Sequence, residues 1–385
     1  MMEAIPAGDA QALARALVRM DSRNPGLADD GPGERACALF LHDVLHAWGF
    51  RTELIDAVPG RPNLVARIGQ DVGGRSLMFN GHLDVVGVEG MTHPPFSGEE
   101  RNGCLYGRGA ADMKGGLASM CAAAWRAAKS GVRGEIVLAA VVDEEYESLG
   151  TRALLAGGVR ADAAIIGEPT GLAIMPAHRG FAWVEVVVTG RAAHGSRWDI
   201  GVDAIRHVGL LLAELDRMDA EMLPLATHPL LGRPSLHASL VSGGIGMSTY
   251  PDRCVLKLER RTIPGESSAD VIAEVQRACV AVRTRRPSFE ASVRLLLSQN
   301  PSDVAVDSSL VRELSTACEA EGEPVRVEGM SAWTDAALLN DAGIPAVCYG
   351  PGDISLAHAA EEYIPLSEID RSTVVLASFA QRWCA

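Results

Sequence analysis

A histidine and an aspartate two residues apart form the first candidate for a metal site. In Gly81-His82-Leu83-Asp84 they lie within an apolar stretch from Leu77 to Val86. Apolar residues on both faces predict a buried strand with the pair at its carboxyl end, where sites gather in open α/β sheets. An aspartate at this spacing can hold one imidazole nitrogen while the other binds a metal ion. A single pair of this kind is more often structural, so its interpretation depends on the rest of the chain.

The second candidate is Asp112, within Gly107-Arg108-Gly109-Ala110-Ala111-Asp112-Met113-Lys114-Gly115-Gly116. The segment nearly matches G-x-G-x-x-G, but Asp112 occupies the sixth position, which disfavours a dinucleotide site. Its glycines would allow the backbone to pack tightly around one acidic side chain. Asp112 is therefore either a buried ligand or the N-cap of an apolar helix that is predicted to end at about Ser130.

Acidic residues also follow two further predicted strands. The apolar strand from Glu135 to Val142 runs into Asp143-Glu144-Glu145, and the strand from Ala161 to Ile166 is followed by Glu168. Neighbouring carboxylates repel one another unless a cation lies close by. The alternative for the acidic run is a solvated loop, although the run adjoins a buried strand rather than a helix surface.

Residues from separate segments together form a mixed nitrogen and oxygen donor set: His82, Asp112, Glu145, Glu168 and His358. Such a set suits Zn²⁺ or a similar divalent ion. These ligands are too many for one catalytic ion with an open position, but they suit two ions that share one carboxylate and a bridging water. Two such ions can activate that water and polarise a carbonyl oxygen. Glu144, beside Glu145, is then the natural general base.

The predicted elements divide the chain into two domains. Residues 1–178 and 299–385 alternate helices and strands, which is typical of an α/β domain. Its predicted elements include helices at 8–20, 32–48, 309–321, 334–340 and from 367, strands at 51–55, 63–68, 325–328 and 345–349, and a long polar loop at 87–103.

The second domain is predicted to be inserted at residues 179–298. Its elements are a strand at 181–189, a helix at 202–218, strands at 235–241 and 253–261, a helix at 267–282 and a strand at 289–297. This order is that of a ferredoxin-like unit.

Composition excludes several other classes of protein. Of the 385 residues 48% are hydrophobic and 22% charged, and the net charge of −14 disfavours a nucleic-acid or anionic-membrane partner. No apolar run approaches the roughly 18 residues of a membrane span, and the first residues show no signal pattern. The eight scattered cysteines indicate reduced thiols in a cytoplasm. The lack of G-x-S-x-G excludes a serine hydrolase of that type.

Ordered motifs along essentially the whole chain resemble one known family. They are Gly81-His82-Leu83-Asp84, Gly107-Arg108-Gly109 with Asp112-Met113-Lys114-Gly115-Gly116, Asp143-Glu144-Glu145, Gly167-Glu168-Pro169-Thr170, Ala193-His194-Gly195-Ser196 and a late His358. This pattern is similar to the di-zinc aminoacylase and carboxypeptidase family, which includes acetylornithine deacetylase, succinyl-diaminopimelate desuccinylase, aminoacylase and glutamate carboxypeptidases. The resemblance implies a mixed-sheet, zinc-exopeptidase-like catalytic domain.

The resemblance also implies a role for each metal-site residue. One zinc ion is bound by His82, Asp112 and Glu168, and the other by Asp112, Glu145 and His358. Asp112 bridges the two ions, and the peptide bond after it is expected to be cis. Asp84 orients His82. Glu144 is the general base and later the acid that protonates the leaving amine. Co²⁺ and Mn²⁺ suit the same ligands.

The inserted domain is implied to be the lid and the dimerisation module of a homodimer. His194, on a lid loop, is expected to stabilise the oxyanion, commonly in the partner subunit's active site. Arg261 matches an arginine that grips a substrate carboxylate. Its alternative is a surface arginine of a strand.

Two departures from the family pattern concern the substrate pocket. Ser248 stands where family members often carry an asparagine, so a hydroxyl replaces an amide in substrate anchoring. The family's Gly-Gly-Thr-Asp turn reads Ala332-Trp333-Thr334-Asp335, with Thr334 as a further substrate-binding candidate. Trp333 either walls the pocket and favours an apolar or aromatic group, or it packs in the core.

Together these features predict a metal-dependent amidohydrolase that cleaves small N-acyl amino acids, as acetylornithine deacetylase does. The nearest alternative is a metallo-dipeptidase or carboxypeptidase on the same scaffold. A third is a non-catalytic metal-binding homologue, although such a protein would have no need of Glu144. The sequence does not identify the acyl group or the side chain of the substrate.

Overall fold

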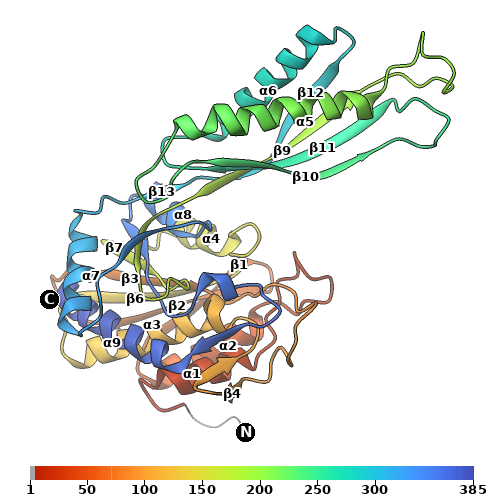
Figure 1. Cartoon of the computed structure of the whole chain (residues 1–385). Coiled ribbons are helices and arrows are strands. Elements are labelled where there is room, and N and C mark those ends of the chain that lie inside the picture. The colour runs from red at the N-terminus through yellow and green to blue at the C-terminus, as the bar shows by residue number, and fades with distance from the viewer. Residues whose placement is uncertain (1–4, 71) are drawn as a thin grey trace. The chain divides into compact units, whose positions relative to one another are not determined.

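The computed structural model describes residues 5–70 and 72–385, which form two compact units (Figure 1). The first unit comprises Met1–Pro176, Val304–Glu328 and Thr334–Ala385. The second comprises Ala177–Asp303 and Gly329–Trp333. The second unit is thus an insertion that divides the first, and each unit has its own hydrophobic core.

A mixed sheet forms the centre of the first unit, which confirms the predicted fold class. Its strand order is β1-β2-β6-β3-β7-β15-β8. The bounds are β1 Arg51–Val58, β2 Arg61–Gly69, β3 Leu77–His82, β6 Glu135–Val141, β7 Ala163–Ile166, β8 Ile174–His178 and β15 Ala346–Cys348. β3 is parallel to β6 and β7, and β15 is parallel to β7, whereas β1, β2 and β8 pair in the antiparallel sense. The parallel strands therefore end at one common edge.

β3 lies in the middle of this sheet, and its apolar sequence suits that position. Every residue from Leu77 to His82 is buried, as expected for a strand that is apolar on both faces. The helix α3 (Gly115–Lys129) is also buried along most of its length, because its alanines and glycines leave room for close neighbours. It packs against α1 (Ala10–Val18) and α9 (Leu366–Trp383).

Several further helices and one further strand belong to the first unit wholly or in part. They are α2 (Arg35–Ala47), α4 (Leu149–Ala156), α7 (Ser309–Ala320), α8 (Ala336–Asp341), η1 (Ala110–Lys114), η3 (Ile354–Leu356) and β14 (Val327–Met330). A small sheet consists of β4 (Glu99–Arg101), β5 (Cys104–Tyr106) and β16 (Tyr363–Pro365), and β4 lies within residues 87–103, where a loop was expected. Asn102 and Gly103 both have positive φ, which is typical of a tight hairpin turn, and this turn joins β4 to β5.

The second unit has the predicted ferredoxin-like order of elements. It comprises β9 (Gly180–Thr189), α5 (Ala204–Glu221), η2 (Leu223–Leu225), β10 (Ser235–Gly243), β11 (Arg253–Thr262), α6 (Ser268–Arg285), β12 (Glu290–Gln299) and the short β13 (Ser302–Asp303). The antiparallel sheet has the order β10-β11-β9-β12. Buried residues alternate along β9, so one face of the sheet packs on the core with α5 and α6. Asp203 and Ser267 cap these helices.

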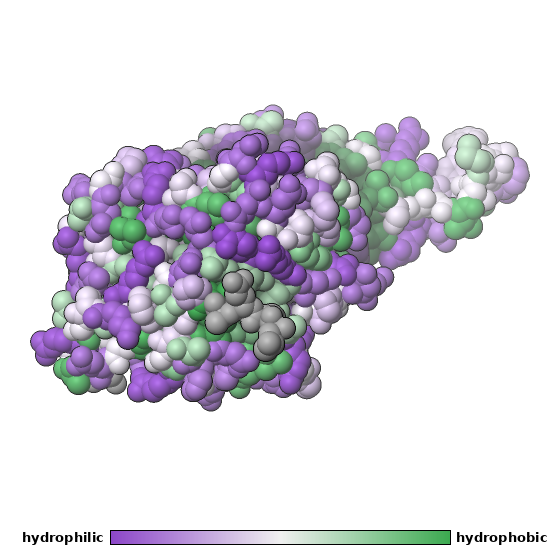
Figure 2. All heavy atoms as spheres, turned by 90° about the horizontal axis from the view of Figure 1, so that it is seen from below, coloured by the Kyte–Doolittle hydropathy of each residue, from purple (hydrophilic) through white to green (hydrophobic). Residues whose placement is uncertain are grey.

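The surface is mixed in polarity. Figure 2 shows hydrophilic residues over most of one face, with hydrophobic residues scattered among them. Among the described residues, no helix is both long and apolar enough to cross a membrane.

Candidate metal centre

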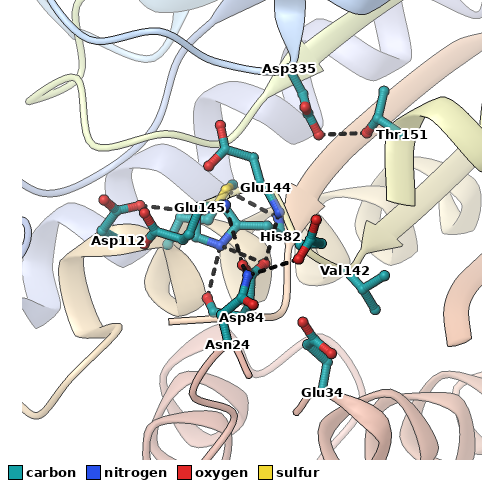
Figure 3. Close-up of polar contacts among 12 residues, drawn as sticks. Asn24, Glu34, His82, Asp84, Asp112, Val142, Glu144, Glu145, Thr151 and Asp335 are labelled. Atoms are coloured by element: carbon teal, nitrogen blue, oxygen red, sulfur yellow. Dashed lines mark hydrogen bonds and ion pairs between the residues drawn. The ribbon is translucent and has the colours of Figure 1, made fainter. Parts of the chain in front are cut away.

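The predicted ligands follow the carboxyl ends of the parallel strands in the first unit. His82 is the last residue of β3, while Glu145 and Glu168 lie in the loops after β6 and β7. Asp112 belongs to η1, and His358 follows η3. Five segments that are far apart in the sequence therefore meet at one edge of the sheet. Figure 3 shows His82, Asp112, Glu144 and Glu145 gathered at this edge.

The ligand atoms form two groups that share Asp112. In the first group, His82, Asp112 and Glu168 each offer an atom within 4.8 Å of the others. In the second, Asp112, Glu145 and His358 do the same. We call these groups the His82 triad and the His358 triad.

The carboxylate of Asp112 faces one histidine with each oxygen. Its Oδ1 lies 3.0 Å from His82 Nε2, and its Oδ2 lies 3.4 Å from His358 Nε2. His358 Nε2 also lies 3.0 Å from Glu145 Oε2, while His82 Nε2 lies 3.9 Å from Glu168 Oε1. This is the arrangement that a shared carboxylate between two ions would need, and it agrees with the pairing that the resemblance implied.

The alternative role of Asp112 as a helix N-cap is wrong. α3 begins only at Gly115, and the N-cap residue of α3 is Lys114. The peptide bond between Asp112 and Met113 is cis, as expected. The alternative of a solvated acidic loop is also wrong for Asp143, which is buried.

In this cluster burial opposes ionisation of the carboxylates, and the neighbouring imidazoles favour it. Burial, followed by nearby carboxylates, raises the pKa values of Glu145 and Glu168 above the usual range. Burial opposes ionisation of Asp112 too, but hydrogen bonds with His358 and His82 outweigh it and hold its pKa low. Hydrogen bonds with Asp112 and Glu145 raise the pKa of His358 to about 10. Three carboxylates with two imidazoles are a donor set that divalent ions would neutralise, so the residues fit two such ions.

Glu144 lies beside both triads without belonging to either. Burial is the main cause that raises its pKa well above the usual range, and the charge of Glu168 adds to it. None of the residues that the structure describes donates a hydrogen bond to its carboxylate. A carboxyl group with a raised pKa and free oxygens is suited to accept and return a proton.

Asp84 contacts His82 in a different way from the one predicted. The backbone oxygen of Asp84 accepts a hydrogen bond from His82 Nδ1 at 2.9 Å, whereas its carboxylate lies 3.6 Å from that nitrogen. The carboxylate instead accepts from the backbone N–H groups of Glu144 and Glu145, at 3.1 and 3.2 Å. Asp84 thus holds the histidine through its main chain and the Glu144-Glu145 turn through its side chain.

Four predicted site residues belong to the second unit: His194, Ser248, Arg261 and Trp333. His194 is exposed, and its Nδ1 accepts from the backbone N–H of Ser196 at 3.3 Å, which leaves the proton on Nε2. Ser248 is exposed. The Arg261 guanidinium pairs with Glu259 at 2.6 Å and lies 5.4 Å from the centre of the Phe181 ring.

Trp333 and Thr334 are neighbours in sequence with different surroundings. Trp333 is half-buried, packs edge-on against Phe181 and His178, and donates to the Asn300 oxygen at 3.0 Å. Thr334 belongs to the first unit, where its buried hydroxyl lies 3.3 Å from Cys348 Sγ. This hydroxyl also accepts a hydrogen bond from the backbone N–H of Ala336, the first residue of α8, so it binds the backbone at the start of that helix.

Sequence reasoning missed the buried groups that support the ligands. Glu362 accepts from the N–H groups of Ala111 and Asp112, at 3.0 and 3.2 Å, and pairs with Arg108 at 2.8 Å. Asp335, already noted in the Ala332–Asp335 turn, accepts from the Thr151 hydroxyl, and burial raises its pKa to about 6. Arg108 lies within the glycine-rich motif and Glu362 follows His358 closely, which were the available signals.

Comparison with known proteins places the chain in a family. The profile of peptidase family M20/M25/M40 matches residues 78–382, so the protein belongs to this family of metal-dependent hydrolases. It is 31% identical over 348 residues to an acetylornithine deacetylase of Myxococcus xanthus, covering 88% of this chain and 90% of that one.

Two further relatives have different names. The chain is 28% identical over 404 residues to an N-formyl-4-amino-5-aminomethyl-2-methylpyrimidine deformylase of Bacillus subtilis, covering 97% and 94% of the two chains. Its fold is similar to that of the aminopeptidase PepT of Bacillus cereus, with a TM-score of 0.81, 21% identity and complete coverage of both chains. All three names describe enzymes that cleave an amide bond, but the substrates that they name differ.

Proposed function

We propose that the protein removes the acyl group from a small N-acyl amino acid, releasing a carboxylate and a free amino acid. The observation that carries this proposal is Glu144, a carboxyl group with free oxygens and a raised pKa beside two triads that share Asp112. The similarity to acetylornithine deacetylase supports an acyl substrate.

In this proposal His82, Asp112 and Glu168 hold one divalent ion, and Asp112, Glu145 and His358 hold the other. Zn²⁺ is the first candidate, and Co²⁺ or Mn²⁺ also suits these ligands. When bound, the ions supply an activated water and polarise the amide carbonyl. Glu144 takes the proton of the attacking water and delivers it to the nitrogen of the leaving amino acid. The carbon–nitrogen bond then breaks, and the acyl group leaves as a carboxylate.

The proposal also gives roles to four residues of the second unit and to Thr334 of the first unit. The Nε2–H of His194 donates to the oxyanion, and Arg261 pairs with the substrate carboxylate. Ser248, Thr334 and Trp333 contribute to substrate binding. The fact that Ser196 donates to His194 Nδ1 supports the first of these roles, because it leaves Nε2 as a donor.

We also propose a cytoplasmic homodimer that forms through the second unit. β10 is an edge strand of its sheet, and its Leu240 and Val241 are 64% and 61% exposed. An exposed edge with apolar side chains is suited to pairing with a second copy. All eight cysteines are free, which suits a reducing compartment. Sedimentation analysis of the purified protein would measure the dimer.

The test of the proposed reaction is amine release by the metal-loaded protein. The substrates are one set of amino acids carrying N-acetyl, N-succinyl, N-formyl or N-aminoacyl groups. We expect turnover of an acyl class. Preferential turnover of the aminoacyl class would instead favour the dipeptidase, and an inert protein with two bound ions would exclude both.

A further inference from the structure

The turn that carries Glu144 and Glu145 rests on two buried carboxylates. Asp84 accepts from the N–H groups of both residues, at 3.1 and 3.2 Å. Asp143, which precedes the turn and has a φ of 68°, accepts from the Glu147 N–H at 3.2 Å. The backbone of the turn is therefore fixed by the positions of the Asp84 and Asp143 side chains.

One neutral side chain joins these two carboxylates from below. Asn24 Nδ2 donates to Asp84 at 2.8 Å and to Asp143 at 3.1 Å, and Asn24 is fully buried. Figure 3 shows Asn24 beside Asp84, on the side away from Asp335. Backbone hydrogen bonds from Asn24 N to Val85 O, and from Val85 N to Ser22 O, hold the asparagine next to the segment that follows β3.

One cation pairs with Asp143 and with a further buried carboxylate, Glu34. The Arg61 guanidinium lies 2.9 Å from Asp143 and donates through Nε to Glu34 at 2.9 Å. It also donates to the Asn24 oxygen at 3.3 Å. Glu34 is completely buried, and the guanidinium of Arg61 is the positive charge that stabilises its ionised carboxylate. The planar fork of arginine contacts three groups at once, which the single ammonium of a lysine cannot reproduce.

We propose that Asn24 and Arg61 are positioning residues for Glu144. They act through Asp84 and Asp143, which hold the backbone of the turn, and they do not touch the substrate. This inference rests on the proposed role of Glu144 as the base. Without the Asn24 amide, Asp84 and Asp143 repel each other with no donor between them, and the turn loses its fixed position.

The experiment compares Asn24→Ala and Arg61→Lys with the wild-type holoenzyme. For each we expect kcat to fall about 10–100-fold, with KM little changed, because the substrate contacts are intact. We also expect the visible absorption spectrum of the Co²⁺-substituted protein to change, because Glu145 moves with the turn. A role limited to overall stability would change neither kcat nor the spectrum at temperatures where the variant is folded.

Arg67→Gln is the matched control. Arg67 lies on β2 like Arg61 and also pairs with a glutamate, Glu135, at 2.6 Å, but Glu135 is at the start of β6, far along the strand from the turn. We expect wild-type kcat and an unchanged spectrum for this variant. Equal losses in Arg67→Gln and Arg61→Lys would overturn the proposal, as would wild-type kcat in Asn24→Ala.

Glu144→Gln separates this inference from the function on which it rests. If Glu144→Gln turns over at the wild-type rate, the proposed base is wrong and the positioning role falls with it. If Glu144→Gln is inactive while folded Asn24→Ala and Arg61→Lys keep wild-type kcat, only the positioning role is overturned. If one of the two variants is not recovered folded, the other decides, because Asn24→Ala changes no charge and Arg61→Lys preserves one.

Discussion

The two triads share Asp112 but differ in their exposure to solvent. In the His82 triad the three side chains are 0%, 10% and 5% exposed. In the His358 triad the histidine side chain is 50% exposed, while Glu145 is 7% exposed. One group of ligands is thus enclosed by the sheet edge, and the other is open on the side of His358.

The histidines also differ in how they are held. His82 ends a buried strand, and its Nδ1 donates to the Asp84 backbone. His358 lies in a loop with a φ of 59°, and its Nδ1 has no hydrogen-bond partner in the described part of the chain. A partner on the second imidazole nitrogen fixes the orientation of the ring and strengthens it as a ligand. The enclosed triad should therefore hold its ion more tightly, and the open triad should exchange its ion with solvent more easily.

Loss of the base should have the largest effect, because Glu144 carries the proton in the proposed reaction. Glu144→Gln should lower kcat by about 10²–10⁴-fold, since an amide cannot accept the proton of water. The metal content should stay at the wild-type value, because Glu144 is not a ligand in either triad. Steady-state kinetics and elemental analysis of the same sample measure the two quantities. Turnover near the wild-type rate with full metal content would contradict the mechanism.

The two histidines provide a direct test of the difference between the triads. His82→Ala leaves Glu168 buried without its histidine neighbour and Asp112 with His358 alone, which should lower the free energy of unfolding of the metal-free protein by about 3–5 kcal/mol. His358→Ala removes a half-exposed partner and should cost about 1 kcal/mol or less. After dialysis, His358→Ala should retain the ion of the His82 triad. Equal losses of stability and metal in both variants would mean that exposure does not distinguish the triads.

The edge of the sheet that carries these ligands was predictable from the sequence. Apolar runs ending in His82, in Asp143-Glu144-Glu145 and near Glu168 gave the strands and their direction. The function of Asp84 was only partly predictable, because the spacing of two residues does not tell whether a carbonyl or a carboxylate oxygen reaches the imidazole. His358 lies in a loop further beyond a strand end, and although the sequence placed it in the donor set, the division of the ligands between two ions depended on the resemblance.

The buried supports could not be found in this way. Asn24 lies in the loop between α1 and α2, Glu34 directly precedes α2, and Arg61 is the first residue of β2. Polar residues in such places are exposed in most proteins. Only the tertiary structure brings them under the Glu144-Glu145 turn. The hairpin of β4 and β5 was missed for a different reason: its strands are too short for an alternating pattern, although Asn102-Gly103 marks the turn.

Chelation should remove the two ions at different rates. A chelator in solution reaches a ligand set that is open to solvent more easily than one that is enclosed. We therefore expect the ion of the His358 triad to leave first, with most of the activity lost in that phase because both ions contribute to the reaction. Metal content and turnover, sampled together during dialysis against a chelator, test this. A single phase in which both ions leave together would contradict the difference between the triads.

The smallest effect is expected from the support of the open triad. Glu362 holds the Ala111 and Asp112 N–H groups, and its partner Arg108 donates to the Ala359 oxygen, next to His358, at 3.2 Å. Glu362→Gln keeps an oxygen for the two N–H groups but loses the charge that pairs with Arg108. The loop of His358 should loosen, and the affinity of the His358 triad for its ion should fall about tenfold. The affinity of the His82 triad should change less, because its histidine is fixed by Asp84 rather than by this pair. Isothermal titration of the metal-free variant with Zn²⁺ resolves the two affinities, and an equal decrease in both would show that Glu362 acts through Asp112 alone.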